Sequence, residues 1–314
     1  MNKQMSKPKL HSWKLIFLPI IILGSVLAYF QIDSRRPSKP QELSGQTPKP
    51  NINLGEEKRR ADHSPPRASS VESKQGSLMI AQYEKAESLW QLLQDASALS
   101  ASGDAEAMYL SARILEECGL ILATPDHLES HVAYLSTLKP EAKPMLGAAL
   151  RLREQRCEGI SEQIDLVELL VTYQVAAESG SVRAALRSLA LGDLAKTSDK
   201  SLNRTIQSAI DSGEPDVIFA LGDVLGAQVS NRTLDLELPH GTELAGYAWQ
   251  IAACSMGANC GRSNPVVLES CLSSGACNYP TLPDLYRGEF VSPSDWQRLM
   301  LLVQQIVNSF PGRG

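Results

Sequence analysis

Aromatic residues are scarce in this 314-residue chain, because Phe, Trp and Tyr together make up 5% of it while the hydrophobic class as a whole reaches 43%. The core must therefore be built mainly from Ala, Leu, Ile and Val, which suits closely packed helices better than strands. An excess of positive charge is also missing, since the formal net charge is −5 at pH 7. Phosphate binding needs a positive field, so we exclude nucleic acid as the main ligand.

Recognisable catalytic motifs are missing as well. The chain contains no G-x-S-x-G elbow, no Ser-His-Asp set and no phosphate-binding glycine loop, so we predict neither an enzyme nor a cofactor. The pair Glu178 and Ser179 resembles the catalytic Glu-Ser of peptidoglycan lytic transglycosylases, where a glutamic acid protonates the glycosidic oxygen. The glycine- and glutamine-bearing segment that comes next in that family is absent, so this enzyme is kept only as an alternative.

A long apolar run lies near the N-terminus. Residues 15–30 read LIFLPIIILGSVLAYF, preceded by four lysines and followed by Arg35 and Arg36. A charged segment before such a run is typical of membrane targeting. We favour an uncleaved, single-pass transmembrane signal-anchor, although Val26 and Ala28 have a spacing that a signal peptidase accepts.

The orientation of the chain can be inferred from its charges and cysteines. Four lysines precede the apolar run, against Arg35, Arg36 and Lys39 shortly after it. This slight excess of positive charge places residues 1–14 in the cytoplasm. All six cysteines lie beyond residue 117, and an exported domain can pair them in an oxidising compartment. We therefore expect a protein of the inner (cytoplasmic) membrane with a periplasmic C-terminal domain.

Residues 31–77 differ in composition from the rest of the chain. They contain six prolines among Ser, Gln and charged residues, and almost no large apolar side chain. Such a segment cannot bury enough surface to offset its ordering entropy. We predict a disordered linker that tethers the next domain to the membrane.

Residues 78–314 carry apolar side chains at intervals of three and four, the pattern of amphipathic helices. A first apolar face runs from Met79 to Ala96, and further faces are expected over residues 107–122, 127–138, 145–157, 164–177, 182–194, 202–210, 217–225, 244–254 and 296–310. Gly103, Gly180, Gly213 and Gly257 follow small residues and should supply the left-handed turns that end helices. The predicted fold class is all-α.

Three segments resemble a known repeat family. The segment AGYAWQIAACSMG at 245–257 looks like the second helix of a Sel1-like repeat, a relative of the tetratricopeptide repeat. VTYQVAAESGSVRAAL at 171–186 and GDAEAMYLSARIL at 103–115 resemble junctions between such repeats. Because the regular repeat length is missing, the resemblance implies an irregular α-solenoid or a bundle of antiparallel helix pairs. Solenoids of this kind present a surface that binds other proteins.

The cysteines are the principal candidate site residues. Cys118 and Cys157 each end a predicted helix, so neighbouring helices could bring them within bonding range. The remaining four, Cys254, Cys260, Cys271 and Cys277, lie in the turn-rich segment 254–277, where we expect two local disulfides of undetermined connectivity. A four-thiolate zinc site is the rival interpretation, although paired C-x2-C knuckles are absent.

Other side chains carry weaker signals. His127 and His131 are one helical turn apart but lack the glutamate of the H-E-x-x-H motif and a third ligand, so we predict no metal site. Trp249 and Trp296 lie on apolar faces and are interpreted as core residues. The prediction is therefore a membrane-anchored envelope protein whose helical domain serves protein binding or scaffolding, with an unidentified protein partner. The alternative is a structural envelope protein without a stable partner.

Overall fold

The computed structural model describes residues 72–123, 125–161 and 165–310. The predicted transmembrane segment 15–30 and residues 31–71 of the predicted linker lie outside these ranges. Within the described ranges, no helix is both long and apolar enough to cross a membrane. Helix begins at Glu72, so residues 72–77, which the composition assigned to the linker, belong to the first described helix.

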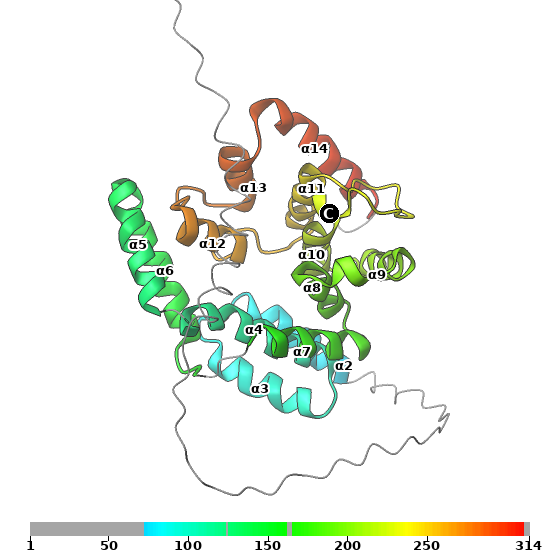
Figure 1. The fold of residues 1–314 in the computed structure, drawn as a ribbon, viewed down its shortest axis with the longest axis horizontal. Coiled ribbons are helices and arrows are strands. Elements are labelled where there is room, and N and C mark those ends of the chain that lie inside the picture. Colours follow the sequence, from blue (N-terminus) through cyan, green and yellow to red (C-terminus); the bar gives the residue numbers. More distant parts are fainter. Residues whose placement is uncertain (1–71, 124, 162–164, 311–314) are drawn as a thin grey trace, which may run out of the picture. The chain divides into compact units, whose positions relative to one another are not determined.

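Every regular element in the described part of the chain is helical, which confirms the all-α prediction (Figure 1). The α-helices are α2 (Glu72–Tyr83), α3 (Trp90–Ala101), α4 (Ala105–Ala123), α5 (Pro125–Leu138), α6 (Lys143–Cys157), α7 (Leu166–Glu178), α8 (Val182–Leu191), α9 (Asp199–Ser212), α10 (Pro215–Leu225), α11 (Glu243–Ser255), α12 (Pro265–Ser274), α13 (Leu282–Leu285) and α14 (Pro293–Asn308). Short helical turns are η1 (Pro140–Ala142), η2 (Asp193–Lys196), η3 (Ala227–Val229) and η4 (Tyr286–Phe290), of which η4 is a π-helical turn.

Local sequence signals account for most helix ends. Hydroxyl and carboxylate side chains such as Asp165 and Ser181 accept a hydrogen bond from the backbone N–H three residues later and so cap α7 and α8. The four glycines predicted to end helices all have positive φ, between 58° at Gly213 and 111° at Gly180. The prediction of one continuous helix over residues 79–96 was wrong. A turn over residues 84–89 divides this stretch between α2 and α3.

The helices pack in a continuous succession. α3 packs on α4, α4 on α7, α7 on α8, α8 on α10, α10 on α11 and α11 on α14 (Figure 1). The largest apolar cluster of the described residues lies among α8 to α14. It includes the fully buried Trp249, whose indole N–H donates to the Pro239 carbonyl at 2.8 Å. This confirms Trp249 as a core residue.

The hairpin of α5 and α6 packs against α12, far away in the sequence. Apolar side chains such as Val132 and Leu146 meet Leu272 there. Polar contacts reinforce the joint, because Arg153 pairs with Glu269 and both His131 and Lys139 bond to carbonyls at the C-terminal end of α12. The segment between Cys254 and Cys277 was expected to be turn-rich, and α12 within it is a helix that the turn signals concealed.

Helices α10 and α11 approach closely through two glycines. A Cβ on Gly222 would lie 2.7 Å from the Gly246 carbonyl oxygen, and a Cβ on Gly246 would lie 2.9 Å from the Gly222 carbonyl oxygen. Only hydrogen fits at these two positions, so the pair sets the distance between the two helix axes. The side chains of Asp223 and Gln250 meet as a result of this approach.

Replacing Gly246 by Ala should destabilise the fold by about 1–3 kcal/mol, because the new methyl group meets backbone that cannot rotate away. Chemical denaturation followed by circular dichroism measures this change. Gly119→Ala in α4 is the matched control, since a Cβ there meets nothing within 4 Å. The control should be neutral or stabilise by up to about 1 kcal/mol, as alanine favours helix. Equal stability of the two variants would contradict the close-packing explanation.

Candidate functional site

All six cysteines are paired in three disulfides. Cys118 in α4 bonds to Cys157 at the end of α6 with a Cα–Cα distance of 5.5 Å, which confirms the predicted proximity of those helices. The other two bonds join neighbours in sequence: Cys254 to Cys260, and Cys271 to Cys277. The pairing settles the connectivity that the sequence left open. It also shows that the four-thiolate zinc interpretation was wrong, because no described cysteine retains a free thiol.

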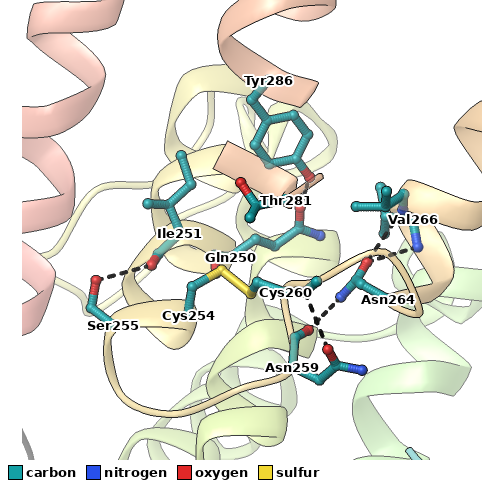
Figure 2. Close-up of a disulfide and its surroundings, with 12 residues drawn as sticks. Gln250, Ile251, Cys254, Ser255, Asn259, Cys260, Asn264, Val266, Thr281 and Tyr286 are labelled. Atoms are coloured by element: carbon teal, nitrogen blue, oxygen red, sulfur yellow. Dashed lines mark hydrogen bonds between the residues drawn. A yellow bond between two sulfur atoms is a disulfide. The ribbon is translucent and has the colours of Figure 1, made fainter. Parts of the chain in front are cut away.

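The Cys254–Cys260 disulfide holds a loop that joins α11 to the segments after it (Figure 2). The Asn264 amide donates to the Asn259 carbonyl at 2.7 Å, and the Leu282 N–H donates to the Cys260 carbonyl at 2.8 Å. The loop is thus tied both to the start of α12 and to the start of α13. Both of its half-cystines remain partly exposed, whereas the other two disulfides are buried.

Several predicted candidates do not meet in a site. Glu178 is exposed at the end of α7, so no pocket encloses the residue that suggested a transglycosylase. The His131 ring bonds to the Ser273 carbonyl at 2.9 Å, and the side chain of His127 lies outside the described atoms. Groups of His, Cys, Asp and Glu suited to a metal ion do not occur among the described residues. Trp296 is half-buried, with the Arg287 guanidinium over its ring at 5.7 Å.

Charged side chains lie together on one side of α4, which forms a polar face. Five residues share one side of this helix because their spacing follows the helical period: Glu106, Tyr109, Arg113, Glu116 and Glu117. Partners for this face come from α2, α6, α7 and α8, all of which pack on α4. The sequence prediction missed this face, although polar residues at intervals of three and four within an otherwise apolar helix were a signal that could have found it.

The Arg183 cluster joins the N-terminal ends of α4, α8 and α10. Arg183 is buried, and it donates to both oxygens of Asp216, at 2.5 and 3.0 Å, and to Glu214. Its Nη1 also lies 3.4 Å from Glu106 Oε2, an ion pair without hydrogen-bond geometry. Burial outweighs the attraction of Arg183 and raises the pKa of Glu106. Three carboxylates around one guanidinium make this cluster net negative.

The Arg187 cluster consists of Arg113, Glu116, Tyr173 and Arg187, from α4, α7 and α8. One oxygen of Glu116 accepts from Arg113 at 2.9 Å, from the Tyr173 hydroxyl at 2.7 Å and from Arg187 Nε at 3.0 Å, while the other accepts from Arg187 Nη2. Burial opposes ionisation, but the two arginines and the tyrosine prevail and lower the pKa of Glu116 to about 2. The side chains of Arg113, Glu116 and Arg187 nevertheless stay 19%, 14% and 26% exposed, so solvent reaches the cluster.

A hydrogen-bond relay ends beside the Arg187 cluster. The Tyr286 hydroxyl donates to Gln250 Oε1, and Gln250 Nε2 donates to Asp223 Oδ1 at 2.8 Å. Figure 2 shows Gln250 and Tyr286 of this relay next to the Cys254–Cys260 disulfide. Burial raises the pKa of Asp223, and the positive charges of Arg187 and Arg113 do not compensate for it. Partly exposed carboxyl groups with a shifted pKa are common at functional sites.

Acid should weaken the Arg187 cluster over a defined pH range. The folded-state pKa of Glu116 is lowered from 4.5 to about 2, so its contribution is complete above pH 4.5 and is lost as the pH falls towards 2. The shift corresponds to about 3 kcal/mol. Urea unfolding at pH 7, 4.5 and 2.5 should show a steeper loss of stability in the parent chain than in Glu116→Gln. Parallel pH profiles for the two chains would contradict this assignment.

Comparisons of the chain with protein-family models, with curated proteins and with solved structures return no match. The candidate site therefore rests on the geometry of the chain itself. It comprises the Arg187 cluster and the relay from Tyr286 to Asp223, which lie on helices that pack in succession. Its guanidinium and carboxyl groups offer hydrogen-bond donors and acceptors to a ligand.

Proposed function

We propose that this chain is a membrane-anchored protein of the cell envelope whose helical domain binds a protein partner on the periplasmic side. Residues 15–30 are the anchor and residues 31–71 the tether in this proposal. The observation that carries the binding role is the Arg187 cluster with Asp223: charged side chains of α4, α8 and α10 converge and yet remain partly exposed. A buried ion pair often stabilises a fold no more than well-packed apolar residues of the same size, so stability alone does not explain these charges.

The proposed architecture is an irregular α-solenoid related to Sel1-like and tetratricopeptide repeats. The succession of packed helices from α3 to α11 supports it, because solenoids stack neighbouring helices and leave one side of the stack for binding. Segment 245–257, which carries the resemblance, forms α11 and its terminal turn. α11 also contributes Gln250 to the relay, so the repeat-like element and the candidate site coincide.

The three disulfides support the proposed compartment, since disulfides persist in oxidising environments and are rare in the cytosol. The test is to alkylate the protein, isolated from its native compartment under acid quench, before and after reduction. We expect no modified cysteine before reduction and six afterwards. A periplasm-active reporter fused after Gly314 should be active in the same cells. Six reactive thiols, or a reporter active only in the cytosol, would refute the periplasmic placement.

The binding role is tested by proximity labelling from the intact anchored chain, followed by crosslinking to identify direct contacts. A binder should give one stable partner, whose recovery falls when Arg113 and Arg187 are both replaced by Gln. The alternative role, a structural envelope protein, predicts labelling of neighbours in proportion to their abundance and no effect of these substitutions. Arg204→Gln, at an exposed position on α9, is the matched control for charge loss.

A further inference from the structure

The Arg187 cluster contains two guanidinium groups and one carboxylate. Two guanidinium groups, those of Arg113 and Arg187, share a single ion-paired carboxylate, Glu116. Asp223 is the next carboxyl group, but within the described contacts it forms no ion pair with either arginine and bonds only to Gln250. The Tyr173 hydroxyl adds no charge. Both guanidinium groups therefore share Glu116, and neither has a hydrogen-bonded carboxylate of its own.

Donor groups are also left over at this position. Among the described residues, hydrogen bonds engage only Nη1 of Arg113, and only Nε and Nη2 of Arg187. Arginine carries five N–H donors in a planar fork, so each side chain keeps N–H groups that its protein partners do not use. Both side chains are partly exposed, at 19% and 26%, and are held in place by Glu116 before any ligand arrives. Such preorganisation lowers the entropic cost of binding.

The charge balance selects the kind of anion. A carboxylate carries one negative charge and matches the fork of a guanidinium with two parallel hydrogen bonds. A phosphate group carries about 1.5 to 2 negative charges at pH 7, so the nearby carboxyl groups of Glu116 and Asp223 disfavour it more than a singly charged carboxylate. The site therefore favours a monoanion of carboxylate type.

We infer that Arg113 and Arg187, oriented by Glu116 and flanked by Asp223, form a binding site for a peptide carboxylate, which is the part of the partner that this domain recognises. The inference rests on the proposed protein-binding function and gives that function its chemical specificity. The carboxylate can be the C-terminus of the partner or an Asp or Glu side chain within it. Both sources present the same group to the guanidinium N–H donors.

The test uses the full chain in detergent micelles and four small probes, with binding followed by saturation-transfer NMR and calorimetry. Acetyl-Ala-Ala with a free C-terminus presents a terminal carboxylate, and acetyl-Ala-Glu-Ala-amide presents a side-chain carboxylate. Acetyl-Ala-Ala-amide is the uncharged control, and inorganic phosphate tests the alternative anion. We expect one or both carboxylate probes to bind, with the difference between them identifying the source, and at least tenfold weaker binding of the amide control and of phosphate.

Three variants test the contributions of Arg113 and Asp223 to binding of the probes. Arg113→Gln should weaken the carboxylate probes at least tenfold, while Arg187 keeps its two bonds to Glu116 and the fold is retained. Arg113→Lys, which keeps the charge but loses the fork, should have an intermediate effect. Asp223→Asn should strengthen binding of the carboxylate probes, because it removes a negative charge near the two guanidinium groups. Circular dichroism melts check the fold of each variant, and Arg204→Gln serves again as the control.

The inference is overturned if no carboxylate probe binds at 10 mM by saturation-transfer NMR, a concentration on the order of the weakest Kd expected for one such contact. It is likewise overturned if phosphate or the amide control binds as tightly as the carboxylate probes. It is also overturned if Arg113→Gln binds the carboxylate probes like the parent chain, or if Asp223→Asn does not strengthen their binding. Failure of the probes while proximity labelling still captures a partner would end this inference and leave the protein-binding proposal standing. Carboxylate binding without a captured partner would support the site and count against that broader proposal.

Discussion

Replacing both Cys118 and Cys157 by Ala should lower the free energy of unfolding by about 4 kcal/mol, because the disulfide closes a loop across a sequence separation of 39 residues. Opening that loop restores conformational entropy to the unfolded chain. Both sulfur atoms are also buried between α4 and α6, so their packing area is lost with the bond. Guanidinium unfolding of parent and variant, with the other two disulfides kept oxidised, measures the difference.

The matched control is the pair Cys271 and Cys277, which is also buried but whose sequence separation is only 6. Its removal should cost less, since the entropy of loop closure grows with the logarithm of loop length. Equal losses from the two double variants would mean that local packing, and not chain entropy, determines the stabilisation.

Replacing Glu117 by Ala should destabilise the domain by about 3–5 kcal/mol, because it leaves the buried Arg156 guanidinium without its counter-charge. Glu117 accepts from Arg156 at 3.0 Å and from the Tyr83 hydroxyl, and Arg156 also donates to the carbonyls of Tyr83 and Ala86. This network joins α2, α4 and α6. The change is measured by urea unfolding at neutral pH.

The double variant Glu117→Gln with Arg156→Met should recover part of the loss, since replacing both charges removes the cost of an unpaired buried ion. The control Lys196→Ala removes a 3.9 Å ion pair between the exposed Lys196 and Asp193, and it should change stability by less than about 1 kcal/mol. A Glu117→Ala variant as stable as this control would show that Arg156 finds another partner or reaches water.

The ion pair and the disulfide between α4 and α6 are adjacent in both helices, since Glu117 precedes Cys118 and Arg156 precedes Cys157. Contacts so close together are coupled, so their energies should not add. Sequence reasoning found the cysteines because each stood at the end of an apolar face. It passed over the charges, because a lone Glu or Arg in a helix looks like a solvated side chain until its partner helix is known.

Local features of the fold could be predicted from the sequence, and contacts at long range could not. The apolar spacing indicated most helices, and the glycines at 103, 180, 213 and 257 marked their ends, because both signals act within a few residues. The relay from Tyr286 to Asp223 spans more than sixty positions and involves no motif. Its formation depends on the approach of Gly222 and Gly246, which the sequence displays only as two ordinary small residues.

The joint between the α5–α6 hairpin and α12 has a consequence for how the chain acquires its structure. The two residues of each polar contact are separated by 116 to 142 positions in the sequence. The hairpin is therefore synthesised long before α12, the helix that covers it. During that interval Val132, Leu135 and Leu146 have no apolar partner on α12 and are open to association with other chains. Docking of α12 should therefore be a late event in folding, and truncation before Pro265 should yield an aggregation-prone product.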